Sequence, residues 1–335
     1  MWEIQQMAGC EIFSRKITFP RHSATLNVVF DPSGSLLGFT FTDEKALLTE
    51  TESAHHIYVS DTIQLPARLT MPSASSVKGR VPVVILVHGS GPSNMDEAMG
   101  PNAPFRDLAE GLSRRGVAVL RYDKRTFVCP QFFENAKEGY TYDDETVDDA
   151  LSAIRLVKDS LAKEKTIDPS RIYIVGHSMG GMLAPRIAQR SGEVAGLVLL
   201  AAPTGKLLPT IERQLAYLGR SAEEIRKLTE IALADIPDSY LDLDARYSDT
   251  ATAQELNIPM LILQGERDYQ VTMDDYRTWR QTVGNRQGVV MKSYPSLNHL
   301  FMAGKGGSMP EEYQTPGHVA EEVMDDIANF VLSGK

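Results

Sequence analysis

Short apolar runs that alternate with helical segments dominate the chain from residue 81 onward. Such runs cover residues 81–89, 116–123, 171–176, 195–203, 258–265 and 288–295. Continuous apolar runs of this length are typical of strands that are buried on both faces. Residues 143–164, between two of the runs, carry apolar side chains at the spacing of one helix face: Val147, Leu151, Ile154, Val157 and Leu161. This alternation predicts an α/β fold with a mostly parallel, doubly wound sheet.

The first part of the chain has a different pattern, that of half-buried strands. Apolar alternation over residues 24–30 and 35–41 flanks an Asp-Pro-Ser-Gly turn at residues 31–34, and this combination predicts a β-hairpin. Residues 11–19 and 56–72 have the same strand-like alternation. We therefore expect short antiparallel strands ahead of the parallel sheet.

These two patterns divide the chain into an N-terminal β-rich region at residues 1–54 and a larger domain at residues 55–335. Within the larger domain, residues 204–254 separate two predicted strands and are rich in helix-forming residues. Ser221 followed by Glu224 forms a capping box, which predicts a helix start. We expect this insertion to form a small helical cap at the carboxyl end of the sheet, where open α/β sheets bind ligands. The alternative is an excursion that packs away from the site.

Composition and charge exclude several classes of partner. The net charge is −10 and no basic run exceeds two residues, so the clustered basic surface that nucleic acid requires is absent. The sequence has no apolar stretch of the roughly 18 residues that a membrane span needs. Cys10 and Cys129 have neither CxxC spacing nor a Cys/His cluster around them, and we predict two free thiols and no metal site.

The N-terminus bears on localisation. Met-Ala-Gly-Cys at residues 7–10 loosely resembles a lipoprotein cleavage box, but neither a basic region nor an apolar segment of about 7–15 residues precedes it. We therefore predict a cytoplasmic protein. The alternative is an exported protein whose signal peptide is absent from this chain.

A candidate nucleophile lies in the pentapeptide Gly-His-Ser-Met-Gly at residues 176–180. It follows a predicted strand and precedes a helical run, which is the setting of a nucleophile elbow. Glycines at 176 and 180 remove side chains that would clash in the strained turn. Ser178 would then lie at a helix N-terminus, where the helix dipole favours developing negative charge. The alternative is an ordinary strand-to-helix turn.

A serine nucleophile needs a base and an oriented acid, and in this kind of sheet their order is serine, acid, histidine. Asp268 is the first aspartate after the predicted strand at 258–265 and is the expected acid, with Glu266 as its main rival. Asp274 and Asp275 suit a helix start instead. His299 follows the next strand and is the expected base, whereas we expect His318 to be a surface helix residue.

A glycine-rich stretch at residues 88–92, His-Gly-Ser-Gly-Pro, ends the first buried strand. Backbone N–H groups there can point at the oxygen of a tetrahedral intermediate. We expect one donor to be the N–H of Met179, just after the nucleophile, and the second to be that of Ser90, with Gly91 as the alternative. His88 precedes the nucleophile, so we expect it to orient this loop and not to act as the base.

The motifs VHGSGP, RYDKR, GHSMGG, LQGERDYQV and LNHLF together resemble the α/β-hydrolase superfamily. More narrowly, the chain resembles bacterial serine carboxylesterases with a small strand-bearing N-terminal domain. The resemblance covers roughly residues 57–330, and residues 17–41 are similar to the strand half of that N-terminal domain. In the family, helices precede these strands. Here only residues 1–9 are available for them, so the domain would be shortened or truncated.

The resemblance implies hydrolysis of carboxylic esters, mostly with small acyl groups, through an acyl-enzyme. By position it implies Ser178 as nucleophile, Asp268 as acid and His299 as base, with the N–H groups of Ser90 and Met179 as oxyanion donors. It implies no metal or organic cofactor. A peptidase or amidase with the same triad stays open. A non-catalytic binding protein is the remaining alternative, and the presence of all three triad residues argues against it.

The expected partner is a small-molecule ester, with neither nucleic acid nor membrane as a partner. Candidate pocket residues, for each of which core packing is the alternative, are Met179, Tyr269, Phe301, Met302, Tyr122 and Phe127, with Leu215, Tyr217 and Leu218 from the cap. Exposed edges of the N-terminal strands are a candidate homodimer surface. Packing of these strands against the larger domain is the alternative that we favour.

Overall fold

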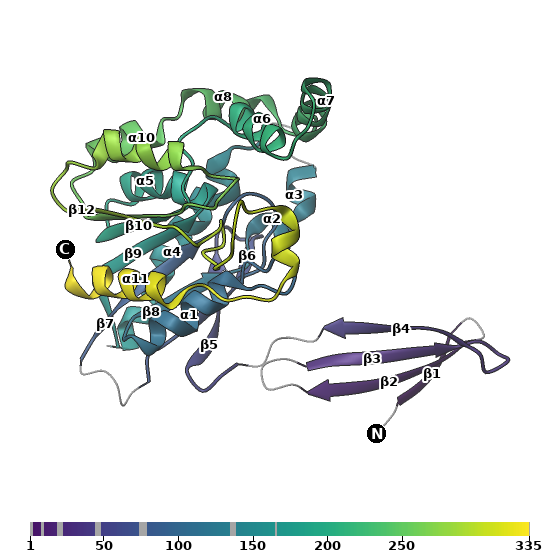
Figure 1. Cartoon of the computed structure of the whole chain (residues 1–335). Coiled ribbons are helices and arrows are strands. Elements are labelled where there is room, and N and C mark those ends of the chain that lie inside the picture. Colours follow the sequence, from purple (N-terminus) through teal and green to yellow (C-terminus); the bar gives the residue numbers. More distant parts are fainter. Residues whose placement is uncertain are drawn as a thin grey trace. The chain divides into compact units, whose positions relative to one another are not determined.

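The computed structural model of the chain describes residues 3–7, 10–18, 23–43, 48–73, 79–134, 139–164 and 166–334 (Figure 1). Its contacts divide the chain into two compact units, Met1–Ser53 and Ala54–Lys335.

The smaller unit contains a four-stranded antiparallel sheet in its described residues, with the strands in chain order: β1 (Glu3–Met7), β2 (Cys10–Thr18), β3 (Ser23–Phe30) and β4 (Leu36–Asp43). The predicted hairpin is confirmed, because β3 pairs with β4. In its turn, the Asp31 carboxylate accepts hydrogen bonds from the N–H groups of Ser33 (2.8 Å) and Ser35 (2.9 Å). Gly34 has a φ of 82°, which glycine adopts readily.

The helices that precede these strands in the resembling family are replaced by a strand in the described part of residues 1–9. Residues 3–7 form β1 and pair with β2, from Glu3 opposite Ser14 to Met7 opposite Cys10. On its other side β2 pairs with β3, from Glu11 opposite Phe30 to Thr18 opposite Ser23. Residues 1–2 and 8–9 lie outside the described residues.

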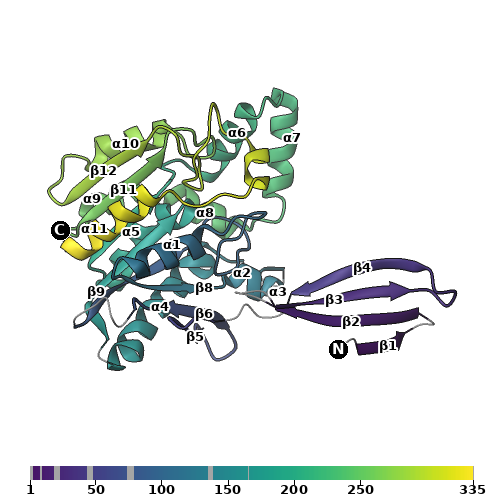
Figure 2. The same cartoon turned by 60° about the horizontal axis from the view of Figure 1, so that its bottom comes forward.

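The larger unit is built on an eight-stranded sheet in its described part, with the order β12-β11-β10-β9-β7-β8-β6-β5 (Figure 2). The strands from β7 to β12 pair in parallel, and β6 pairs antiparallel with β8. Their bounds are β5 (Glu52–Tyr58), β6 (Gln64–Thr70), β7 (Val81–Val87), β8 (Ala118–Tyr122), β9 (Ile167–His177), β10 (Gly196–Leu200), β11 (Met260–Gly265) and β12 (Val289–Tyr294).

Helices cover both faces of this sheet, as successive side chains of β7 illustrate. Val83 and Ile85 belong to one apolar core and Val84 to the other, because neighbouring strand residues point to opposite faces. The first core includes side chains of α4 (Asp148–Asp159), α5 (Met179–Ser191), α9 (Asp249–Glu255) and α10 (Met273–Val283). The second includes α1 (Pro104–Arg114) and α11 (Glu321–Ser333). The predicted doubly wound α/β fold is confirmed.

The insertion between β10 and β11 is helical, as expected. Its helices are α6 (Leu207–Tyr217), α7 (Ala222–Leu233), α8 (Asp238–Arg246) and α9. The capping box that starts α7 is confirmed, since Ser221 and Glu224 exchange side-chain and backbone hydrogen bonds. Short helical segments complete the unit: α2 (Arg125–Val128), α3 (Pro130–Glu134), η1 (Asp143–Val147), η2 (Leu161–Glu164) and η3 (Pro310–Gln314).

Two features that bear on function are absent from the described residues. None of their helices combines the length and apolar character that crossing a membrane requires. Nor do these residues bring together three or more His, Cys, Asp or Glu side chains in an arrangement that could hold a metal ion.

Candidate active site

Ser178 lies in a strained turn between β9 and α5. Its φ of 51° and ψ of −119° fall outside the regions that non-glycine residues ordinarily occupy, a strain of about 1–3 kcal/mol. The Ser178 N–H donates to the carbonyl of Leu200 on the neighbouring strand (2.8 Å). A Cβ at Gly180 would lie 2.2 Å from the Val87 carbonyl oxygen, and one at Gly176 would lie 2.2 Å from that of Gly180. The backbone therefore packs too tightly here for any other residue type.

Asp268 and His299 come together after β11 and β12. Asp268 Oδ2 accepts a hydrogen bond from His299 Nδ1 (2.7 Å), and both side chains are buried. The other oxygen, Oδ1, accepts from the N–H groups of Gln270 (2.8 Å) and Val271 (3.0 Å). Gln264 Nε2 also donates to Oδ2 (3.2 Å). These donors hold the carboxylate in one orientation and leave His299 Nε2 as the nitrogen that can accept a proton.

The nucleophile segment lies beside this pair. His177, the residue before Ser178, has its ring centroid 4.6 Å from that of His299. Ser178 itself is partly exposed to the cavity described below. Three residues that the sequence places at the ends of different strands are thus gathered at one edge of the sheet.

The rival residues lie elsewhere. Glu266 is exposed and accepts a hydrogen bond from Ser293 Oγ (2.7 Å). Asp275 caps the start of α10, as expected for the Asp274–Asp275 pair. His318 is on the surface as expected, but it precedes α11 instead of lying in a helix, and its Nδ1 faces Asp107 (3.0 Å).

His88 is also separate from the Asp268–His299 pair. Burial lowers the pKa of His88 to about 4, so its imidazole is neutral at physiological pH. Its Nε2 lies 3.0 Å from the Asn94 carbonyl, so the imidazole donates a hydrogen bond to the loop after β7. This contact agrees with the expected role of His88 in orienting that loop.

A buried lysine holds the glycine-rich loop after β7. Lys124 Nζ donates to the carbonyl oxygens of Gly89 (2.8 Å) and Gly91 (3.2 Å) and to Glu145 Oε1 (2.6 Å). In a trans peptide the C=O and the following N–H point in opposite directions. Because Lys124 draws the Gly89 carbonyl toward itself, the N–H of Ser90 points away from the lysine. This orientation is compatible with Ser90 as the second oxyanion donor, and both Ser90 and Gly91 line the cavity that contains Ser178.

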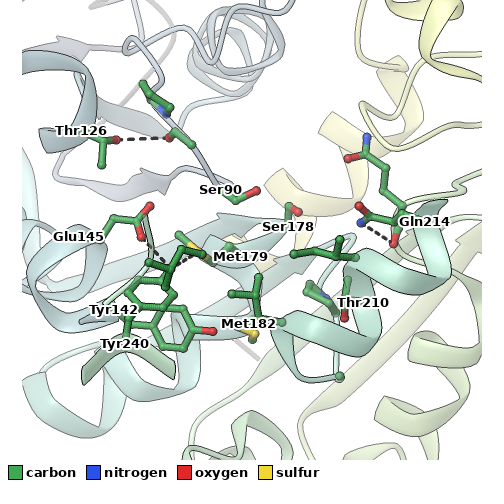
Figure 3. Close-up of a pocket in the computed structure, with 18 of the residues that line it drawn as sticks. Ser90, Thr126, Tyr142, Glu145, Ser178, Met179, Met182, Thr210, Gln214 and Tyr240 are labelled. Carbon is green, nitrogen blue, oxygen red and sulfur yellow. Dashed lines mark hydrogen bonds between the residues drawn. The ribbon is translucent and has the colours of Figure 1, made fainter. Parts of the chain in front are cut away.

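The expected first donor, the N–H of Met179, lies at the start of α5. The first N–H groups of a helix have no acceptor within the helix, so this one is available to a ligand. Figure 3 shows Ser90, Ser178 and Met179 around one cavity.

This cavity has a volume of about 450 Å³. One end is aromatic: Tyr240 from α8 packs edge-on against Tyr142 (4.3 Å between ring centroids) and Tyr140 (5.7 Å). The other end is formed by one face of α6, whose lining residues Leu207, Thr210, Ile211 and Gln214 have the i, i+3, i+4, i+7 spacing of a helix stripe. The helical insertion therefore forms part of the cavity wall, and the alternative that it packs away from the site is wrong.

Most of the predicted pocket residues do not line this cavity. Of that group Met179 does, but Tyr269, Met302 and Leu218 pack with Leu300 and Tyr313 in a separate cluster, and Phe301 belongs to the core under α1 and α11. Leu215 is off the α6 stripe, and Leu218 lies beyond the end of the helix. Tyr217 stacks on Tyr269, Tyr122 is buried against His88, and Phe127 is exposed.

The sequence reasoning also missed several polar residues at the site. Lys124 and Glu145 are separated by 21 residues, and Tyr240 OH donates to Glu145 Oε2 (2.7 Å) from the cap. Gln264 was part of a predicted strand. Of these residues, only Lys124 could have been found from the sequence, since it belongs to the RYDKR motif. Glu145 and Tyr240 are polar residues whose partners are distant in the chain, whereas Gln264 bonds to residues that follow it closely, Gly265, Asp268 and Val271.

Comparisons with known proteins identify sequences and folds that are similar to this chain. A family model described as "Alpha/beta hydrolase family" matches residues 84–325. Esterase EstD of Thermotoga maritima is 37% identical over 347 aligned residues, which cover 97% of this chain and 80% of EstD. Among solved structures, the Pyrococcus furiosus esterase Pf2001 has a TM-score of 0.58 at 18% identity and covers 84% of this chain and 91% of its own. Est1E from Butyrivibrio proteoclasticus has a TM-score of 0.53 at 20% identity, with 84% and 98% covered. At these sequence identities, the similarity to the two structures shows the fold alone.

Proposed function

The chain belongs to the α/β hydrolase family, and we propose that it is a carboxylesterase that uses Ser178, His299 and Asp268 as a catalytic triad. The observation that carries the proposal is the buried Asp268–His299 hydrogen bond beside the strained Ser178 turn. The name of the 37% identical relative, an esterase, supports ester hydrolysis as the reaction.

In the first half-reaction, Ser178 Oγ attacks the ester carbonyl carbon and its proton passes to His299 Nε2. Asp268 holds the imidazole in the tautomer that has Nε2 free, and its charge stabilises the imidazolium. The carbonyl oxygen becomes an oxyanion that accepts hydrogen bonds from the N–H groups of Ser90 and Met179. When the tetrahedral intermediate collapses, His299 returns the proton to the leaving alkoxide and an alcohol departs.

In the second half-reaction, water attacks the acyl-enzyme. His299 takes a proton from the water as its oxygen bonds to the acyl carbon, and the same two N–H groups hold the second oxyanion. Collapse breaks the bond to Ser178 Oγ, which recovers its proton from His299. The products are a carboxylic acid and free enzyme.

For the acyl part we propose a small group, as the resemblance implied. The cavity of about 450 Å³ is larger than such a group fills. Aromatic and aliphatic side chains line most of the remainder, so we propose an apolar alcohol part there.

A matched pair of substrates tests ester against amide hydrolysis. We expect turnover of p-nitrophenyl acetate and none of p-nitroacetanilide above the buffer rate, because the anilide has the poorer leaving group. Diisopropyl fluorophosphate should inactivate the enzyme and add its phosphoryl mass to the peptide that contains Ser178. Hydrolysis of the anilide at a similar rate would contradict the esterase assignment and show that the protein is an amidase. Labelling of a different residue would overturn the assignment of the nucleophile.

A panel of esters tests the proposed size of the acyl part and the proposed apolar character of the alcohol part of the substrate. We expect kcat/KM to fall from p-nitrophenyl acetate to the octanoate, and to be higher for naphthyl acetate than for phenyl acetate, whose leaving group is similar but smaller. A preference for the octanoate would contradict the small acyl group and leave the triad untouched.

Replacing Lys124 tests whether this lysine holds the glycine-rich loop at residues 88–92, which we call the oxyanion loop, in its orientation. Lys124→Met is expected to lower kcat for p-nitrophenyl acetate by about 10²–10³-fold, the loss typical of removing one oxyanion donor. The reason is that the Gly89 and Gly91 carbonyls lose the cation that orients the Ser90 N–H. KM should change little, because this interaction is made in the transition state.

The controls separate orientation from folding. Lys124→Met leaves the Glu145 carboxylate buried without its cation, so the double variant Lys124→Met/Glu145→Gln is measured beside it. Lys158→Met removes a lysine whose ion pair with Glu193 is at the surface, and should leave activity unchanged. A folded Lys124→Met enzyme with wild-type kcat would rule out this role.

A further inference from the structure

A buried histidine and a buried glutamate lie beneath the triad and take no part in the mechanism above. His177, the residue before the nucleophile, is 5% exposed. Glu97, from the loop between β7 and α1, is 7% exposed. Neither lines the cavity that contains Ser178.

Both ring nitrogens of His177 face acceptors. Nε2 lies 3.0 Å from the backbone carbonyl oxygen of His299, and Nδ1 forms an ion pair with Glu97 Oε2 at 3.0 Å. A carbonyl oxygen and a carboxylate oxygen accept hydrogen bonds and cannot donate them. The contact between Nδ1 and Glu97 Oε2 has the distance of an ion pair but does not meet the geometry of a hydrogen bond. A carboxylate beside Nδ1 and a carbonyl oxygen beside Nε2 both favour a proton on the nitrogen that they face, and a proton on each makes the ring an imidazolium cation.

Glu97 extends the connection to the oxyanion loop. Its other oxygen, Oε1, accepts a hydrogen bond from the N–H of Gly89 (2.7 Å). The backbone of Glu97 has a φ of 49°, a conformation that costs energy for a residue with a side chain. One carboxylate thus joins the loop after β7 to His177, and His177 joins the nucleophile turn to the loop that carries His299.

The surroundings of the pair are largely apolar. A void of about 10 Å³ beside it is lined by apolar side chains that include Phe105, Leu200 and Leu300. This is at the lower limit of the roughly 10–15 Å³ that a water molecule needs. Either charge alone would be costly in such a place, whereas the two together neutralise each other.

The pKa directions agree with this geometry. Burial is the largest single influence on the pKa of His177 and by itself would lower it, but the Glu97 carboxylate together with the His299 carbonyl and Asp268 raises it. Burial is also the largest single influence on the pKa of Glu97 and by itself would raise it, but His177 together with smaller contributions such as the Gly89 N–H lowers it. Other ionisable groups face the pair: Asp268, which favours the cation, His88, which is neutral, and His299, whose ring centroid lies 4.6 Å from that of His177.

We propose that His177 and Glu97 form a permanent imidazolium–carboxylate pair that positions the oxyanion loop, the nucleophile turn and the His299 loop relative to one another. Both are positioning residues that exchange no proton with the substrate. The inference rests on the proposed function, because it is the catalytic role of these three segments that makes their relative placement matter.

The charge of His177 can be measured without an activity assay. In long-range ¹H–¹⁵N spectra of histidine-labelled wild-type enzyme at pH 7, both ring nitrogens of His177 should have the shifts of a protonated imidazolium. The resonance is assigned through its backbone connectivities. A neutral His177 ring would overturn the proposed imidazolium–carboxylate pair, even if the enzyme hydrolyses esters. An enzyme that is inactive but has a protonated His177 would overturn only the proposed esterase function.

The pair also sets the sign of a pH dependence. Because the pKa of His177 is raised above 6.5, its stabilisation is full below that pH and is lost as pH rises through the raised value. Because the pKa of Glu97 is lowered below 4.5, its stabilisation is full above that pH and is lost as pH falls through the lowered value. The stabilisation of wild type relative to Glu97→Gln/His177→Gln should therefore be greatest between pH 4.5 and 6.5, and a pH-independent difference would contradict the pair.

A double-mutant cycle tests the positioning role. His177→Gln leaves Glu97 charged and unpaired, so we expect a lower melting temperature and a kcat at least tenfold below wild type, with KM unchanged because neither residue lines the cavity. Adding Glu97→Gln should restore part of both losses, since the neutral pair can still hydrogen bond. A double variant that is less active than His177→Gln, or a His177→Gln enzyme with wild-type kcat and melting temperature, would overturn the proposal.

Discussion

Ser178→Ala is expected to hydrolyse p-nitrophenyl acetate about 10⁴–10⁶-fold more slowly than the wild type, the range seen when a serine nucleophile is removed. The substitution deletes only the Oγ that attacks the carbonyl. Alanine keeps the Cβ of serine, so the strained backbone with its φ of 51° carries the same penalty in both proteins. The melting temperature should therefore stay close to that of the wild type, and kcat is measured at saturating ester.

A matched control is available on the same strand. Ser170 is an exposed serine of β9 whose hydroxyl donates to Asp168, far from the cavity. Ser170→Ala should keep wild-type activity. If Ser178→Ala retained a kcat within tenfold of the wild type, another nucleophile would have to carry the reaction.

Asp268→Asn is expected to lower kcat by about 10⁴-fold without unfolding the protein, as in triads where the acid becomes an amide. The amide oxygen will take the place of Oδ1, where two backbone N–H groups donate. The NH₂ group then faces His299 Nδ1 and donates to it. His299 must carry its proton on Nε2, and that tautomer cannot accept the proton of Ser178.

Glu266→Gln is the control for this prediction. Glu266 lies two residues from Asp268 in the chain, is exposed, and bonds to Ser293 instead of His299. The substitution removes one negative charge from the same loop and should leave kcat within about twofold of the wild type. An Asp268→Asn enzyme with more than a tenth of wild-type kcat, or an equal loss in Glu266→Gln, would contradict the assignment of the acid.

The local sequence pattern was sufficient to predict much of this site. The Gly-x-Ser-x-Gly pentapeptide between an apolar run and a helical run predicts a tight turn, and Gly176 and Gly180 are where the backbone leaves no room for a Cβ. Asp268 and His299 follow successive strands, and the carboxyl ends of parallel strands meet at one edge of a sheet. The order of elements therefore determines which residues come together.

The pocket could not be predicted in the same way. Whether Gln214 or Leu215 faces the cavity depends on the rotation of α6 about its axis, and one residue turns the side chain by about 100°. That rotation is set by how the cap packs on the larger unit. Tyr269 and Met302 were plausible because they are close in sequence to Asp268 and His299, yet they point into a separate cluster.

By itself, the sequence determined the doubly wound sheet, the hairpin at residues 31–34, the strained serine and the order of the candidate triad, because each depends on periodicity or on neighbours in the chain. Only the tertiary structure decided which residues line the cavity, that Lys124 holds the oxyanion loop, and that His177 and Glu97 share a buried site. These features join residues that are 33 to 80 positions apart or depend on which face a helix presents. Contacts of this kind come from packing, which no local pattern encodes.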